Sequence, residues 1–306
     1  MVRSRDGELT GVEALLLWTH PALGHISAPI TAAAAERGGT SDQLSDWVLR
    51  RSCRDWLQWS AGRAPGSVDL SVNVSARQLM TPGFPATVSR VLAETGMSAA
   101  GLVLEVTETI LIEDNTRAIR TSKELKSLGI RLELDNFGAG LGAFNALRRS
   151  PFDIVKTDRS LVATMTSDPT SVAMVAAIAA VAHTLNMTVI AAGVETLEQH
   201  QSVVNAGSDL AQGFFLAPPM SAGALSAALI QRGRLSPCVR KLVAVDRLRE
   251  VGAICRRRFP VFLGIFAVKR CCATGLLSRA VRGIRGHEAL SALNKPPASG
   301  SCGGCR

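Results

Sequence analysis

Tyrosine is absent from this 306-residue chain, and all aromatic residues together make up only 4% of it. A core with so few rings must be filled by Ala, Val, Leu and Ile, which suit helices packed around a buried parallel sheet. Hydrophobic residues reach 47%, enough to fill a sizeable core. The length fits one α/β barrel or two ordinary domains.

Cysteine is almost absent from residues 1–235, where Cys53 stands alone. A disulfide framework is therefore excluded there, and the N-terminus lacks the apolar stretch of a secretory signal. Both absences predict a reducing, cytoplasmic setting. The other six cysteines lie in residues 236–306, and the final C-x-x-C pair has no second pair near it, which disfavours a metal or redox role.

A basic surplus is also absent from residues 1–235, which hold 20 Lys and Arg against 22 Asp and Glu. Residues 236–306 hold 14 Lys and Arg against 3 Asp and Glu, so the net charge of +9 comes from this segment. It does not indicate DNA or RNA binding by residues 1–235. We predict a domain at 1–235 and a basic, Cys-rich tail at 236–306 that is disordered or non-native. Its apolar run Phe259–Val268 is too short to cross a bilayer, although an amphipathic membrane contact stays open.

Runs rich in Val, Ile and Leu alternate with helical patterns along residues 1–235, as is typical of βα units and a parallel sheet. Seven strands are one short of a closed eight-stranded barrel. The predicted strands are Gly11–Trp18, Val68–Val74, Leu102–Thr107, Ile130–Asp135, Asp153–Thr157, Thr188–Ala192 and Leu210–Phe215. The predicted helices are Ser45–Trp59, Phe84–Thr95, Asn115–Leu128, Ser171–Leu185, Leu197–Ala206 and Ala222–Gln231.

Polar residues fall at the carboxyl ends of these strands, where barrel enzymes carry their chemistry. Several carboxylate and amide oxygens meeting at one mouth are costly to bury without a cation, and hard oxygen ligands suit Mg²⁺ or Mn²⁺. A lysine beside them can orient a water or offset the charge of a phosphate. The candidates are Glu13 within the first strand, then Asn73, Glu105, Glu108, Asp135, Lys156, Asp158, Glu195 and Gln212.

The motifs occur in an order that resembles the EAL domain family, the cyclic-di-GMP-specific phosphodiesterases, over roughly residues 8–234. So many motifs in sequence make the resemblance far more specific than a single three-residue match. They are Glu13-Ala14-Leu15 with Trp18 and His20-Pro21, Asn73-Val74-Ser75, Glu105-Val106-Thr107-Glu108, Asp135-Asn136-Phe137-Gly138, Lys156-Thr157-Asp158-Arg159-Ser160, Ala191-Ala192-Gly193-Val194-Glu195-Thr196 and Gln212-Gly213.

The resemblance implies a TIM-type (β/α)8 barrel in which two divalent cations, Mg²⁺ or Mn²⁺, activate a water that opens cyclic-di-GMP to a linear dinucleotide. It also implies a possible homodimer. Lys156 would orient the water, Gln212 would support the site, Glu108 would steady a nearby loop, and Glu195 belongs to the catalytic motif. The implied metal-binding positions are Glu13, Asn73, Glu105 and Asp135 for the first cation, with Asn136 and Asp158 also at the metals.

Two departures from the family pattern fall on the chemistry. Asn136 replaces the second Asp of D-D-F-G, and Ala192 replaces the first Glu of E-G-V-E, which weakens the second metal site. We therefore expect a degenerate domain of cyclic-di-GMP signalling with weak or no hydrolysis. A functional phosphodiesterase that yields linear pGpG stays the alternative, because the first-metal set is complete. Outside the family, an unrelated barrel enzyme with one divalent cation is a further alternative.

Other departures touch the substrate and the fold. Leu17 stands where the family usually has an Arg that contacts the ligand, and the loop Ala139–Phe144 lacks the two serines of the family pattern. The Y-Q-P-I segment that precedes the EAL motif is also missing. The barrel is therefore predicted to lack its first strand.

Overall fold

The computed structural model describes residues 1–60, 68–108, 116–138, 147, 151–232 and 243–245. It divides into two compact units, described separately: Met1–Trp18 with Ser27–Asp246, and Thr19–Ile26 with Arg247–Arg306. The serine-free loop Ala139–Phe144 and the tail cysteines lie outside the described residues.

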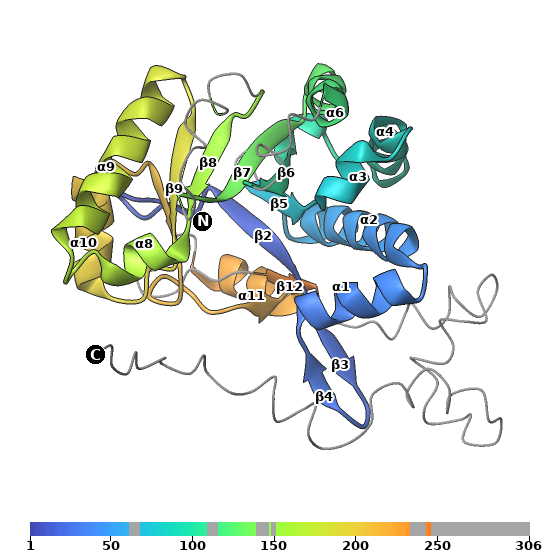
Figure 1. Ribbon diagram of the computed structural model, residues 1–306. Helices are drawn as coiled ribbons and strands as arrows, with labels where there is room; N and C mark the ends of the chain where they lie inside the picture. The colour runs from blue at the N-terminus through green and yellow to red at the C-terminus, as the bar shows by residue number, and fades with distance from the viewer. Residues whose placement is uncertain (61–67, 109–115, 139–146, 148–150, 233–242, 246–306) are drawn as a thin grey trace, which may run out of the picture. The chain divides into compact units, whose positions relative to one another are not determined.

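The first unit is built on one parallel sheet that curves into a nearly closed barrel (Figure 1). Its spatial order follows the chain, so each strand pairs with the next, as expected for repeated βα units. The seven predicted strands are confirmed as β2 (Gly11–Leu16), β5 (Asp69–Asn73), β6 (Leu102–Thr107), β7 (Arg131–Phe137), β8 (Ile154–Thr157), β9 (Thr188–Ala192) and β10 (Leu210–Gln212).

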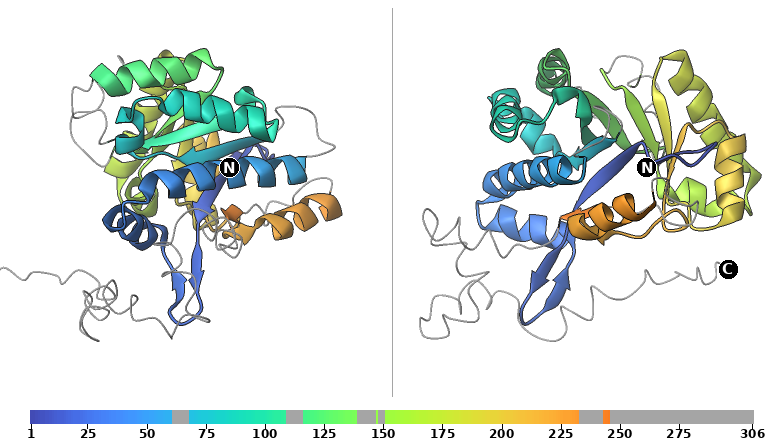
Figure 2. Two further views of the ribbon diagram at one scale, coloured as in Figure 1. Left: turned by 90° about the vertical axis from the view of Figure 1, so that its right-hand side faces the viewer. Right: turned by 180° about the vertical axis from the view of Figure 1, so that it is seen from behind.

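Helices cover the outer face of this sheet (Figure 2). Six were predicted and are confirmed to within a few residues: α2 (Ser41–Ser60), α4 (Phe84–Thr95), α6 (Thr116–Ser127), α9 (Pro169–Thr184), α10 (Leu197–Asn205) and α11 (Ala222–Arg232). Three were missed, two of which are too short to display a helical period. They are α1 (Ala28–Arg37), α3 (Ala76–Met80) and α8 (Arg159–Thr164), beside a 3₁₀ turn at Ala99–Gly101.

The sheet ends in short strands rather than a full eighth βα unit. The two-residue β1 (Val2–Arg3) pairs antiparallel with β10, and Val2 also bridges to Leu9 just before β2. On the other side of β2 lie β12 (Val243–Val245) and β11 (Met220–Ser221), both parallel. The parallel sheet thus lacks a full first strand, as predicted.

Three residues of the predicted tail, Val243–Val245, form strand β12 on the edge of β2. They form a strand because the edge of β2 offers unpaired backbone groups that this apolar segment can satisfy. The domain boundary at residue 235 stays a prediction, since residues 246–306 lie outside the described part of the chain.

The core consists almost entirely of aliphatic side chains, as the scarcity of aromatics predicts. Strand β6 is buried at five successive positions, which is the pattern of a strand covered on both faces. On the barrel's inner face, however, β6 and β7 carry charged residues. Glu105 and Glu133 are essentially inaccessible to solvent there. The largest fully buried aliphatic side chains are Leu70, Leu79, Leu102, Leu104, Leu125, Ile130, Leu132, Leu134, Leu147, Ile178 and Ile190.

A small hairpin pairs β3 (Trp18–His20) with β4 (Gly24–Ile26), and its residues Thr19–Ile26 are the described part of the second unit. The His20 ring accepts hydrogen bonds from the backbone N–H groups of Ala22 and Leu23, both at 3.1 Å, and so closes the turn. Gly24 follows with a left-handed φ of 73°. Across both units, none of the described helices combines the length and the apolar character that crossing a membrane requires.

Candidate active site

Six of the residues predicted for the site come from six strands of the barrel sheet and converge at their carboxyl ends. The register of the strands brings these residues together. Asn73 on β5 pairs with Glu105 on β6, and Thr107, two positions after Glu105, pairs with Asp135 on β7. Because side chains alternate along a strand, residues two apart share the inner face. The six are Glu13 on β2, Asn73 on β5, Glu105 on β6, Asp135 on β7, Lys156 on β8 and Gln212 on β10.

Lys156 lies at the centre of this group, with only 4% of its side chain exposed. Its Nζ lies 2.8 Å from Glu105 Oε2, 3.0 Å from Glu13 Oε2, 3.2 Å from Glu133 Oε1 and 3.7 Å from Asp135 Oδ1. Burial by itself lowers the pKa of Lys156, but the surrounding carboxylates outweigh it and raise that pKa well above its ordinary value. The amine is therefore a hydrogen-bond donor and a fixed positive charge, not a base.

Glu13 is held by three donors. Gln212 Nε2 donates to its Oε2 at 2.7 Å, Asn73 Nδ2 donates to its Oε1 at 3.0 Å, and Lys156 supplies the third bond. Burial acts to raise the pKa of Glu13, but Lys156 and these hydrogen bonds lower it below its ordinary value. The carboxylate is thus ionised and oriented before any ligand arrives.

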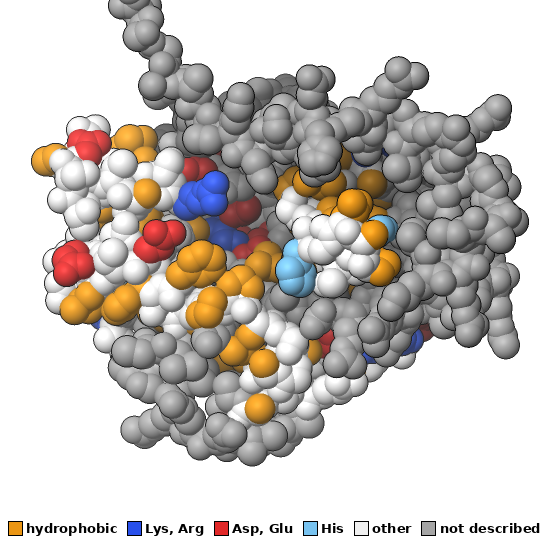
Figure 3. Space-filling view, turned by 90° about the horizontal axis from the view of Figure 1, so that it is seen from below, with side chains coloured by type: hydrophobic (Ala, Val, Ile, Leu, Met, Phe, Trp, Pro, Cys, Tyr) orange, Lys and Arg blue, Asp and Glu red, His pale blue; other side chains and the backbone are white. Residues whose placement is uncertain are grey.

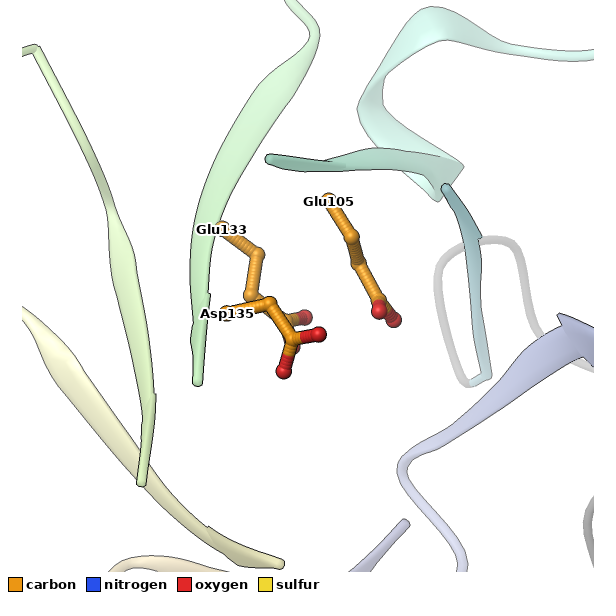
Figure 4. A group of neighbouring side chains, drawn as sticks. All are labelled: Glu105, Glu133 and Asp135. Carbon is orange, nitrogen blue, oxygen red and sulfur yellow. The ribbon is translucent and has the colours of Figure 1, made fainter. Parts of the chain in front are cut away.

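Glu105, Glu133 and Asp135 point toward one another (Figure 4), with one oxygen of each within 4.8 Å of the others. Burial raises the pKa of all three carboxyls. The neighbouring negative charges add to the effect, most strongly at Glu105, whose pKa is raised well above its ordinary value. Such a group favours either bound protons or a bound cation.

Glu133 is the residue that sequence reasoning missed. It lies on β7 two positions before Asp135, so the two-residue period of a strand places both on the inner face. That spacing is the signal that could have identified it. Glu133 is fully buried, and Ser71 Oγ donates to its Oε2 at 3.4 Å.

At the outer edge of the site, two positions lack the carboxylates of the family pattern. Asn136 has a left-handed φ of 58°, a conformation that asparagine tolerates well, and its Nδ2 donates to Asp135 Oδ2 at 2.9 Å. Ala192 ends β9 in register with Gln212 and offers no ligand atom on its side chain. The structure therefore places Asn136 beside Asp135 and Ala192 beside Gln212.

Glu108 joins two strand ends and does not contact Lys156 in the described structure. Its Oε2 accepts a hydrogen bond from Gly138 N at 3.1 Å, while its own backbone N–H donates to the carbonyl of Asp135 at 3.0 Å. Burial raises the pKa of Glu108. This contact holds the backbone of Gly138 just after β7, and the loop-steadying role of Glu108 stays a prediction.

Asp158 and Glu195, like Glu108, make no contact with Lys156 in the described structure. Asp158 caps helix α8, and its Oδ1 accepts from the backbone N–H of Ser160 at 2.8 Å. Glu195 is exposed, and its backbone N–H donates to Gln199 Oε1 at 2.7 Å.

A cavity of about 180 Å³ adjoins Gln212. Its wall includes the exposed residue Arg159 and Phe214, whose side chain is 64% exposed. Seen from below, one hollow of the molecule shows acidic and basic side chains side by side, with hydrophobic ones around it (Figure 3). The lining residues are Arg159, Gly193, Glu195, Gln212, Gly213, Phe214, Ala217 and Pro219.

Comparison with protein families bears on the alternative of an unrelated barrel enzyme. The family pattern described as EAL domain matches residues 1–219, which is most of the chain. The chain belongs to the EAL domain family. An uncharacterized signaling protein of Caulobacter vibrioides is 37% identical over 228 residues, covering 74% of this chain and 27% of the relative.

The bifunctional diguanylate cyclase/cyclic di-GMP phosphodiesterase MucR of Pseudomonas aeruginosa is 34% identical over 230 residues, 74% of this chain and 33% of its own length. This EAL domain thus spans about a third or less of the curated relatives it matches. Among solved structures, the PaMucR phosphodiesterase in complex with c-di-GMP is similar with a TM-score of 0.65 and 33% identity, covering 70% of this chain and 86% of the other. The EAL domain of Mycobacterium smegmatis DcpA is similar with a TM-score of 0.64 and 28% identity. The match covers 77% of this chain and 94% of the other.

The side chains of this EAL domain fit a hard divalent cation. Glu13, Glu105 and Asp135 offer carboxylate oxygens, and Asn73 adds an amide oxygen. Among the described residues, Glu105 Oε1 and Gln212 Oε1 are buried and accept no hydrogen bond. Buried acceptors without partners are costly, and a cation with its water shell would satisfy them.

Proposed function

We propose that this EAL domain binds cyclic-di-GMP at the carboxyl ends of its strands and hydrolyses it weakly in the presence of Mg²⁺ or Mn²⁺. The observation that carries the proposal is the contrast within one site. The inner acidic group around Lys156 is complete, whereas Asn136 and Ala192 leave its outer edge without two carboxylates.

Glu13, Asn73, Glu105 and Asp135 would hold the first cation. When two divalent cations are bound, they supply an activated water and a clamp on the attacking and leaving oxygens. A second cation would share Asp135 but would find only the neutral amide of Asn136 beside it. An amide is a weaker ligand than a carboxylate, so this cation would be held poorly.

Lys156 would act through its protonated amine. Its high pKa keeps the charge in place, so it can hold a water or a phosphoryl oxygen by hydrogen bonding but cannot remove a proton. Gln212 and Asn73 would keep Glu13 in its orientation through the bonds at 2.7 and 3.0 Å.

The cavity beside Gln212 supports the choice of ligand. Arg159 can pair with a phosphate, and the exposed ring of Phe214 offers a face for a purine base. The PaMucR phosphodiesterase, similar in fold, was solved in complex with c-di-GMP. The absence of a DNA or RNA partner, the homodimer and the cytoplasmic location remain predictions.

The second candidate function is an efficient phosphodiesterase. The completeness of the first-metal set favours it, and so do the phosphodiesterase activities for which two Pseudomonas aeruginosa relatives at 34–35% identity are named. The two candidates differ in rate, not in ligand.

Restoring the two carboxylates separates these candidates. Asn136→Asp combined with Ala192→Glu should raise metal-dependent hydrolysis of cyclic-di-GMP about 100-fold or more, and each single change should raise it less. Removal of a transition-state contact typically costs such factors, so its restoration should regain them. Circular dichroism must first show that parent and variants are equally folded.

Glu13→Gln in the restored background is the matched control, because it removes one ligand charge from the first metal and should abolish the gain. A folded double mutant that binds Mn²⁺ yet turns over no faster than the parent would overturn the explanation and point to Leu17. A parent that already hydrolyses as fast as an intact family member would establish the second candidate.

A further inference from the structure

Glu133 has no role in the site described so far, although it is fully buried inside the barrel. It makes the number of carboxylates around Lys156 four, with Glu13, Glu105 and Asp135. In the described part of the chain, Lys156 is the positive side chain in ion-pair contact with this group. One ammonium cannot balance four carboxylates, and buried charge without a partner is expensive.

The carboxylate oxygens also lack hydrogen-bond donors. Lys156 donates to Glu13 and Glu105, whereas its 3.2 Å approach to Glu133 Oε1 is an ion pair without hydrogen-bond geometry. Glu133 Oε1 and Glu105 Oε1 are both buried and accept no hydrogen bond from any described residue. The opposite oxygen of Glu133 accepts only the long bond from Ser71.

The geometry supplies what a hard cation needs. One oxygen each of Glu105, Glu133 and Asp135 lies within 4.8 Å of the other two, and the three side chains converge in Figure 4. Ligand oxygens about 2.1 Å from Mg²⁺ or Mn²⁺ lie at most about 4.2 Å from one another, so small shifts of the three carboxylates would bring them to coordination distance.

We propose that Glu133 is a further metal ligand, and that Glu105, Glu133 and Asp135 together hold one divalent cation on the inner side of the EAL site. This inference rests on the proposed function, because it concerns the metals of that same site. Glu133 adds a carboxylate from within the barrel. At the edge of the same site, Asn136 and Ala192 stand where the family pattern has two carboxylates. The competing role is a purely structural ion pair with Lys156.

Mn²⁺ binding to the full chain tests the proposal directly. Calorimetric titration and the loss of the free Mn²⁺ paramagnetic resonance signal would be measured for the parent and for Glu133→Gln, without nucleotide. Glu133→Gln keeps the size of the side chain and removes its charge. It should weaken Mn²⁺ binding about tenfold or more and reduce the melting-temperature increase that Mn²⁺ produces.

Asp69→Asn is the matched control. Asp69 is also a strand carboxylate on the barrel sheet, but it lies at the opposite end of β5 from Asn73 and pairs with Arg131. Its removal changes the net charge equally and should leave Mn²⁺ affinity unchanged. Equal weakening in both variants would mean that only net charge matters, and would overturn the proposal.

The remaining outcomes separate the inference from the proposed function. A parent that binds no Mn²⁺ would contradict both. A parent that binds Mn²⁺ only as tightly as Glu133→Gln does would overturn the role of Glu133 and leave the proposed function standing. If Glu133→Gln does not fold, Glu133→Asp keeps the charge on a shorter side chain. A ligand role then predicts weaker Mn²⁺ binding, and unchanged binding would refute it.

Discussion

The inner and outer parts of the site differ in how strongly the fold depends on them. Glu13, Glu105, Glu133 and Lys156 are all buried and interlinked, whereas Asn136, Arg159 and Glu195 are exposed. Both departures from the family pattern lie at the edge, at Asn136 and the half-buried Ala192. Loss of a buried partner leaves an uncompensated charge, but an exposed side chain can change at little cost to stability. Catalytic strength can therefore be lost at the edge while the inner group persists.

The strongest way to break this comparison is Lys156→Met. It leaves three buried carboxylates and the half-buried Asp135 without their ammonium, so the free energy of unfolding should fall by about 3–5 kcal/mol in metal-free urea denaturation. Lys126→Met is the control, since Lys126 forms a partly exposed pair with Asp153 and should cost about 1 kcal/mol or less. Similar losses in the free energy of unfolding for both variants would show that the buried group around Lys156 contributes no more to stability than a partly exposed ion pair.

The pH dependence of Mn²⁺ binding sharpens the comparison. Burial raises the pKa of Glu105 and Glu133, so metal-free protein retains protons at pH values where an ordinary glutamate, with a pKa of about 4.3, has lost them. Mn²⁺ must displace these protons, and its affinity should therefore rise with pH.

Calorimetry at a series of pH values from about pH 5 upward should show the affinity still rising where exposed carboxylates of ordinary pKa have already lost their protons. The increase should be smaller in Glu133→Gln, which has one fewer carboxyl to deprotonate. An affinity that does not change over this range would contradict the burial argument.

Glu108→Ala addresses the boundary between the two parts. The change removes the hydrogen bond to Gly138 and should lower the free energy of unfolding by about 1 kcal/mol, measured by urea denaturation. Mn²⁺ affinity should stay within about twofold, because Glu108 makes no contact with Lys156 in the described structure. A tenfold loss of affinity would place Glu108 among the metal ligands instead.

The smallest effect is expected for Glu195→Gln. This side chain is exposed beside the cavity, so stability should change by less than about 0.5 kcal/mol. Binding of cyclic-di-GMP, measured by calorimetry, is the sensitive readout for a role in the ligand pocket. A large loss of stability would mean that the edge is as tightly built as the interior.

Much of the fold could be predicted from the sequence. The bounds predicted for β6, β9 and α4 match the structure because each reads as an uninterrupted apolar or helical pattern of adequate length. The helices α3 and α8 have five and six residues, too few to display a period. The pairing of β12 with β2 joins segments that are far apart in the chain. The hydrophobic pattern within either segment cannot predict such a contact.

The sequence by itself determined the family, the order of the strands and six of the polar residues that meet at their carboxyl ends. Only the tertiary structure decided that Glu133 belongs with them. A glutamate in an alternating strand is compatible with a solvent-exposed face as well as with a buried one. Closure of the barrel makes the inner face of β7 a buried surface, and that places the carboxylate of Glu133 against Lys156.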